Sequence, residues 1–199
     1  MIAVLTGDIK NSTEQEASIW LPELKQALNH YGKEPKEWEI YRGDSFQLVT
    51  TPGKALEASL YVKASIKQFK NLDVRIAIGL GEKGYQAEKV TESNGEAYVH
   101  SGKCFEGLKR QNLGIKSSHK AFDDQMNLLL ELALLTMDHW PPATAQTVKN
   151  AIKNPKKNQK ELAQLLNKSQ GNISEELTKA GFDALQKMTK FYNAQLPKP

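Results

Sequence analysis

The chain has 199 residues, of which 39% are hydrophobic and 25% are charged, and its formal net charge is +4. These values are typical of a folded protein with a buried core, and they exclude a disordered or collagen-like chain. The single cysteine, Cys104, excludes an internal disulfide framework. The first residues lack the basic start of a signal peptide, and the apolar stretch 126–137 is too short to span a bilayer. We therefore expect a cytoplasmic protein with no membrane partner.

The first 110 residues alternate between strand-like and helix-like patterns. Gly43 and Asp44 form a tight hairpin signal between two of the strands. The resulting order, strand-helix-strand-strand-helix-strand-helix, is close to the split βαβ arrangement of ferredoxin-like folds. The expected strands cover 2–5, 38–42, 46–50 and 72–80, and the expected helices cover 13–31, a segment that begins at Pro52, and a segment from 95 to about 110.

From residue 122 onward the pattern is helical, with breaks at Pro141-Pro142 and at Gly181. The sequence thus predicts an α+β fold class with a ferredoxin-like domain at 1–118 and an all-α domain at 119–199. The expected C-terminal helices cover 126–137, a segment that ends near 152, 159–166, 170–180 and 182–195.

Two aspartates form the first candidate site. Asp8 ends the first strand, and Asp44 lies in the hairpin, so a ferredoxin-like sheet brings both to one edge. Neighbouring carboxylates repel unless a cation joins them, and Mg²⁺ or Mn²⁺ is the expected cofactor. The following residues, Asn11, Ser12 and Thr13, begin a helix whose free N–H groups can hold a phosphate. The alternative is structural, with Asp8 as a cap and Asp44 as an ordinary hairpin residue.

Four segments carry further information: VLTGDIKNST at 4–13, YRGDSF at 41–46, DVRIAIG at 73–79 and GEAYVHSGK at 95–103. In this order they resemble class III nucleotidyl cyclase domains. The second segment is also similar to the hairpin of diguanylate cyclases. The resemblance implies a nucleotidyl cyclase-like fold in which Asp8 and Asp44 bind metal.

The chain departs from the cyclase pattern at the remaining active-site positions. Ile40 stands where cyclases select the purine, and Val99 and Lys103 stand where they place a transition-state Asn and an Arg. In an enzyme, Lys103 and Arg42 would have to supply the missing catalytic contacts. The retained aspartates and the helical C-terminal half are similar to SatD-like bacterial proteins, which join such a domain to a helix-turn-helix.

The second candidate site is a helix-turn-helix at about 158–180. Ala163 is small enough to let two helices cross closely, and Ile173 and Leu177 would face the first helix. Lysines at 149, 153, 156, 157 and 160 can meet phosphates, whereas Glu175 and Glu176 oppose a DNA backbone. The predicted DNA-binding residues are Lys156, Lys157, Lys160, Ser169, Gln170, Asn172 and Lys179.

Three functions follow from these patterns. The first is a DNA-binding regulator whose cyclase-like domain binds a metal and a nucleotide or another phosphorylated small molecule. The second is a metal-dependent nucleotidyl or phosphoryl transferase, and the third is a module for protein–protein interaction. If the chain binds DNA, we expect a homodimer, with the apolar helix at 126–137 as interface or core.

Overall fold

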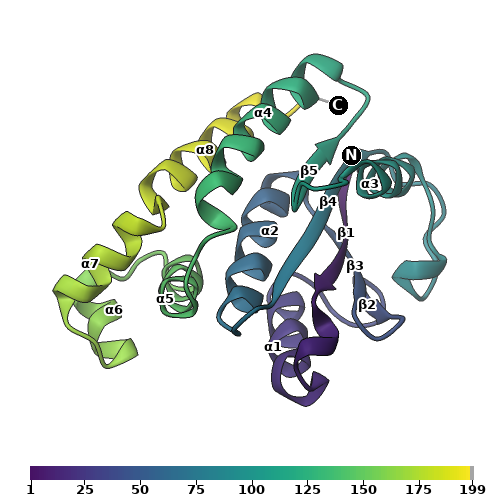
Figure 1. Ribbon diagram of the computed structural model, residues 1–199. Helices are drawn as coiled ribbons and strands as arrows, with labels where there is room; N and C mark the ends of the chain where they lie inside the picture. The colour runs from purple at the N-terminus through teal and green to yellow at the C-terminus, as the bar shows by residue number, and fades with distance from the viewer. Residues whose placement is uncertain (198–199) are drawn as a thin grey trace.

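The computed structural model describes residues 1–197, which form a five-stranded mixed sheet and eight α-helices (Figure 1). The sheet order is β2-β3-β1-β4-β5, in which β1 lies at the centre and pairs antiparallel with β3 and β4. The edge strand β5 is parallel to β4. The strands are β1 (Ile2–Lys10), β2 (Trp38–Tyr41), β3 (Ser45–Thr50), β4 (Asp73–Gly81) and β5 (Leu113–Lys116).

The helices follow the predicted order, although several begin elsewhere than expected. The helix expected at 13–31 begins only at Ala17, because Ser12–Glu14 forms a separate 3-10 turn. The helix expected at 126–137 already begins at Lys120. The helices are α1 (Ala17–Asn29), α2 (Pro52–Lys67), α3 (Glu96–Gly107), α4 (Lys120–Met137), α5 (Pro142–Lys153), α6 (Gln159–Leu166), α7 (Gln170–Lys179) and α8 (Phe182–Gln195).

Helices α2 and α3 cover opposite faces of the sheet (Figure 1). Alternate residues of β4 face the two helices, as expected for a strand buried on both sides. On the α3 side the strand carries Gly79, where an added Cβ would lie 2.1 Å from the carbonyl oxygen of Ala97 and 2.3 Å from the backbone N of Ser101. Only glycine at this position lets α3 pack so closely on the sheet.

Helix α2 lies between the sheet and the C-terminal helices. It packs on β4 and β1 on one side and on α5 and α8 on the other, and most of its side chains are buried. One continuous cluster of buried apolar residues joins Leu5 and Ile78 of the sheet to Leu60 of α2, Val148 of α5 and Leu185 of α8. The helical C-terminal half therefore shares its core with the sheet, where the sequence suggested a division near residue 118.

A group of buried charges lies where α2, β4 and the end of α4 meet. Lys63 of α2 is 1% exposed, and its Nζ is 2.7 Å from Oδ1 of both Asp73 and Asp138. Lys67 binds the second oxygen of Asp73 at 3.2 Å, and Asn112 donates to the second oxygen of Asp138 at 2.9 Å.

Within residues 1–197, no helix is long and apolar enough to cross a membrane.

Candidate functional site

Asp8 and Asp44 do lie at the same end of the sheet. Asp8 of β1 stands opposite Ser45 of β3 in the strand register, and the N–H of Ile9 donates to the carbonyl oxygen of Asp44 at 3.1 Å. The hairpin turn before β3 holds Arg42 and Gly43 at positive φ, 54° and 88°. This turn brings the aspartate of the hairpin next to the end of the central strand.

Each of these carboxylates already has a partner. Asp8 pairs with Arg75, which stands directly opposite it on β4 and donates from Nε to Oδ1 at 2.9 Å and from Nη2 to Oδ2. This hydrogen bonding raises the pKa of the Arg75 guanidinium, which also lies 5.0 Å from the centre of the Phe105 ring. Asp44 accepts a hydrogen bond from the Ser12 hydroxyl at 2.7 Å. Arg75 thus supplies the positive charge that the sequence analysis assigned to a metal ion.

The donor set does not fit Mg²⁺ or Mn²⁺ as it stands. Both oxygens of Asp8 bind Arg75, and one oxygen of Asp44 binds Ser12. Across residues 1–197, no group of three or more His, Cys, Asp or Glu side chains is placed to hold a metal ion. The metal role of the two aspartates stays a prediction, since it would require Asp8 to release Arg75.

The helix expected to begin at the predicted phosphate site starts later in the chain, and the phosphate role of Asn11, Ser12 and Thr13 stays a prediction. Asn11, Ser12 and Thr13 do not begin a long helix but a 3-10 turn of three residues, which offers no aligned row of free N–H groups. The Asn11 side chain donates to the carbonyl oxygen of Asn71 at 3.0 Å. Arg42 and Lys103, the candidate catalytic cations, are both exposed, on the hairpin and on α3 respectively.

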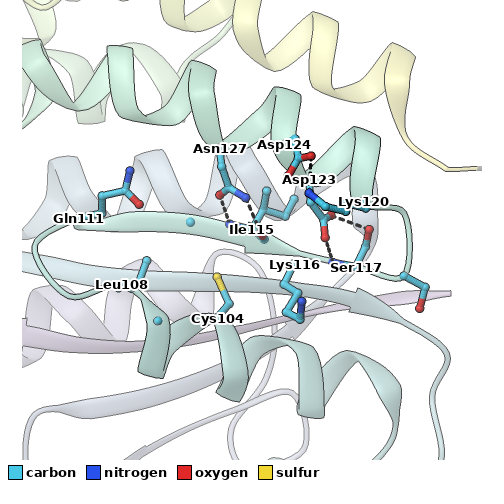
Figure 2. A pocket seen from close by; sticks show the side chains of 13 residues that line it. Cys104, Leu108, Gln111, Ile115, Lys116, Ser117, Lys120, Asp123, Asp124 and Asn127 are labelled. Atoms are coloured by element: carbon cyan, nitrogen blue, oxygen red, sulfur yellow. Dashed lines mark hydrogen bonds and ion pairs between the residues drawn. The ribbon is translucent and has the colours of Figure 1, made fainter.

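A groove of about 510 Å³ lies elsewhere, between α3, β5 and the start of α4 (Figure 2). None of the residues predicted for either site lines it. Asn127 reaches from α4 to the outer edge of β5, where its amide accepts from the N–H of Ile115 and donates to the carbonyl oxygen of Ile115, both at 2.9 Å. Asp123 binds the N–H of Ser117 at 2.9 Å in the same way. These side chains close the strand edge against pairing with another chain.

Cys104 points into this groove from α3 (Figure 2). Burial raises the pKa of its thiol to about 12, and the nearby carboxylate of Asp123 adds to the shift. Because the thiolate is the reactive form, this shift disfavours reaction of Cys104 at neutral pH.

The second predicted site is formed by α6, a turn of three residues and α7. A capping box begins α6, in which Asn158 accepts from the N–H of Glu161 at 3.0 Å and the Glu161 carboxylate accepts from the N–H of Asn158 at 2.7 Å. Asn167 ends α6 in the left-handed conformation, and the Ser169 hydroxyl accepts from the N–H of Asn172 to cap α7. Ala163 and Ile173 are buried between the helices, as the pattern predicted.

The two acidic residues of α7 have different roles. The Glu176 carboxylate turns inward, where it accepts from Lys168 at 2.8 Å and from the hydroxyl of Thr147 on α5. Glu175 is exposed and forms an ion pair with Lys179 at 2.6 Å. Of the two acids expected to oppose a DNA backbone, only Glu175 lies on the outer face of the helix.

The basic residues near α6 are mostly exposed. Lys153, Lys156, Lys157 and Lys160 lie on the surface, whereas Lys149 pairs with Glu23 of α1 at 2.6 Å and is only partly exposed. All seven predicted DNA-binding residues are exposed. Residues 139–199 hold ten lysines and four acidic residues, a net charge of +6, which leaves −2 for residues 1–138 of a chain whose total is +4.

In comparisons with known proteins, the chain matches no family model, no curated protein and no solved structure. Arg75 and Asn127 could not be picked out from the sequence. Arg75 fits the alternating pattern of a strand and Asn127 the pattern of a helix, and neither pattern indicates that the residue pairs with Asp8 or with the edge of β5. The position of Arg75 opposite Asp8 becomes visible only once the strand register is known.

Proposed function

We propose that this protein is a DNA-binding regulator and that α6 and α7 form its helix-turn-helix. The observation that carries the proposal is the exposed first turn of α7, which presents Gln170 and Asn172 while Glu176 is held inward by Lys168. Gln and Asn side chains can pair with adenine through two hydrogen bonds in the major groove. A recognition helix contacts bases mainly through its first residues, so the polar side chains at the start of α7 are the ones expected to contact bases.

Charge supports the same assignment. The net charge of +6 on residues 139–199 is concentrated near α6, where exposed Lys156, Lys157 and Lys160 precede or begin the helix. Lysines in such a position bind phosphates and supply most of the affinity for DNA of any sequence. The buried contact of α5 with α7 fixes the orientation of the pair, as a third helix does in helix-turn-helix domains.

We further infer that residues 1–118 form a ferredoxin-like domain. The β-α-β-β-α-β order and the strand order β2-β3-β1-β4 support this assignment, with β5 as an added edge strand. The cyclase resemblance suggests that this part binds a nucleotide or another phosphorylated ligand. Because both oxygens of Asp8 bind Arg75, exposed Arg42 in the hairpin turn is the group that we expect to bind the ligand's phosphate.

Thermal unfolding with a panel of nucleotides in EDTA, and again with Mg²⁺, tests this ligand. We expect a nucleotide to raise the melting temperature without Mg²⁺, and Arg42→Gln to abolish the shift. A shift that needs Mg²⁺ and is lost in Asp8→Asn/Asp44→Asn would instead restore the metal role. No shift with any nucleotide would refute ligand binding by the sheet.

Binding to a fluorescent duplex of random sequence, measured by anisotropy at several salt concentrations, tests the DNA-binding proposal. Each lysine–phosphate contact contributes about 0.9 to the slope of log K against log[salt], so Lys156→Gln/Lys157→Gln/Lys160→Gln should reduce the slope by about 2.7. The matched control replaces three exposed lysines of the sheet half, Lys25, Lys36 and Lys54, by Gln and should leave the slope unchanged. Equal loss in both variants, or no binding by the wild type, would refute the proposal.

A further inference from the structure

Helix α4 is apolar on two opposite sides. Its inner side buries Met126, Leu130, Leu134 and Met137 in the core. Its outer side carries Leu128, Leu132 and Leu135, which are 59%, 55% and 70% exposed. A helix that is hydrophobic all round normally lies inside a protein, so the outer side of α4 lacks a cover in the single chain.

The three outer leucines form one continuous stripe. Residues four and then three positions apart lie above one another on a helix, which places Leu128, Leu132 and Leu135 on a single line. The stripe lies on the side of α4 opposite the residues that the helix buries in the core. The neighbouring helix α8 also has a partly exposed aromatic side chain, Phe191, which is 40% exposed. The surface is therefore a ridge of leucines rather than scattered apolar residues.

The sequence of the stripe is nearly symmetric about its centre. Leu128 and Leu135 are equally distant from the midpoint between Glu131 and Leu132, and so are Asp124 and His139, which lies in the turn two residues after α4 ends. When a second α4 packs against the first in the antiparallel direction, Leu128 meets Leu135, Leu132 lies opposite Glu131, and Asp124 comes close to the turn that carries His139. The imidazole can then donate to a carboxylate whose present partner, Lys120, forms only an exposed pair. This is the self-complementary pattern that a twofold interface requires.

We propose that the outer face of α4 binds a second copy of this chain, with the two α4 helices antiparallel. The reason for two copies rests on the proposed function, since a single small helix-turn-helix offers little contact area and such domains commonly bind DNA as pairs. Helix α4 precedes α5 directly, so a dimer through α4 would fix the spacing of the two recognition helices.

Sedimentation velocity of the full chain from about 1 to 200 μM, without DNA, tests the interface. We expect a monomer–dimer equilibrium in which Leu132→Glu raises the dimer dissociation constant at least about 30-fold, as for a residue at the centre of an interface. Ile19→Glu is the matched control, because Ile19 is 51% exposed on α1, and it should leave the equilibrium unchanged. A monomer at every concentration, or a dimer that Leu132→Glu does not weaken, would overturn the proposal.

Disulfide trapping tests the antiparallel direction. Leu128→Cys and Leu135→Cys proteins, both carrying Cys104→Ala, are mixed and oxidised, and the joined peptides are identified by mass. We expect 128–135 links to exceed 128–128 and 135–135 links, and the reverse result would overturn the antiparallel arrangement. Circular dichroism confirms that each variant is folded. A dimer that binds no DNA would refute the proposed function alone, whereas a DNA-binding monomer would refute this interface alone.

Discussion

Lys63→Met is the substitution that most directly tests the buried charges between α2 and α4. The Lys63 side chain is 1% exposed and binds Asp73 and Asp138 at 2.7 Å each, so its loss leaves two carboxylates without their main partner. Breaking a buried ion pair by removing one partner costs about 3–5 kcal/mol. Lys67 and Asn112 remain in place, and the side chain of Asp138 is 28% exposed. We therefore expect the lower end, about 3 kcal/mol.

Urea unfolding followed by circular dichroism measures this loss. In a thermal unfolding experiment on a chain of this size, the same loss of 3 kcal/mol would lower the melting temperature by about 6–12 °C. Lys54→Met is the matched control, because Lys54 is exposed on the same helix and a surface substitution changes the free energy of unfolding by only about 0.5 kcal/mol. A loss below about 1 kcal/mol for Lys63→Met would show that the cluster adds nothing over an apolar contact.

The pH dependence of this difference has a definite sign. Burial alone would raise the pKa of Asp138, but the charge of Lys63 and hydrogen bonds from Lys63 and Asn112 outweigh burial and lower it. A carboxyl whose pKa is depressed in the folded state stabilises the protein above its unfolded pKa of about 3.9, and this stability is lost as the pH falls through the folded value. The difference between wild type and Lys63→Met should therefore be full at pH 7 and shrink towards pH 3. A constant difference would refute the electrostatic explanation.

Three further predictions concern single side chains. Asn127→Leu removes the side-chain amide that pairs with the N–H and carbonyl of Ile115, so it should lower the free energy of unfolding, measured by urea titration, by about 2 kcal/mol. A change under about 0.5 kcal/mol would contradict the role of Asn127 in closing the edge of β5. The native Cys104 thiol, with its pKa raised to about 12, should react with a thiol reagent at pH 8 far more slowly than in urea, and equal rates would contradict its burial. Glu175→Gln should strengthen binding to random duplex DNA several-fold, because Glu175 is exposed on α7, whereas Glu176→Gln should not. Equal effects of the two substitutions on DNA affinity would contradict the inward position of Glu176.

The sequence predicts the elements better than their ends. The strand pair around Gly43 and the helices predicted at 159–166 and 170–180 are confirmed, the second ending at Lys179, because turn and capping residues mark them locally. The first helix begins four residues later than predicted, at Ala17 rather than at Thr13. β5 escaped prediction because four residues around Gly114 carry no alternation, and the strand depends on pairing with β4 and on Asn127.

Partners between distant elements could not be predicted. Asp8 and Arg75 stand opposite each other only because β1 and β4 pair in one register. Lys149 looks like part of a basic run, yet it is the one that turns to Glu23 on α1. Composition and periodicity place these charges on surfaces, whereas their pairing depends on tertiary packing. The predicted metal site depended on the repulsion between Asp8 and Asp44. In the structure Arg75 neutralises the charge of Asp8, and the sequence gives no sign of this pair.

The shared core bears on how a ligand at the sheet would regulate DNA binding. Asp138 at the end of α4 is bound by Lys63 of α2, and Lys149 of α5 is bound by Glu23 of α1, so ion pairs as well as apolar packing join the two halves. Helix α2 contacts β1, β4, α5 and α8, so it connects the sheet directly to α5. A ligand that moves the sheet strands would therefore act on α6 and α7 through α2 and α5. In a dimer formed through α4, the same displacement would change the spacing of the two recognition helices, which is the quantity that matches a regulator to its half-sites.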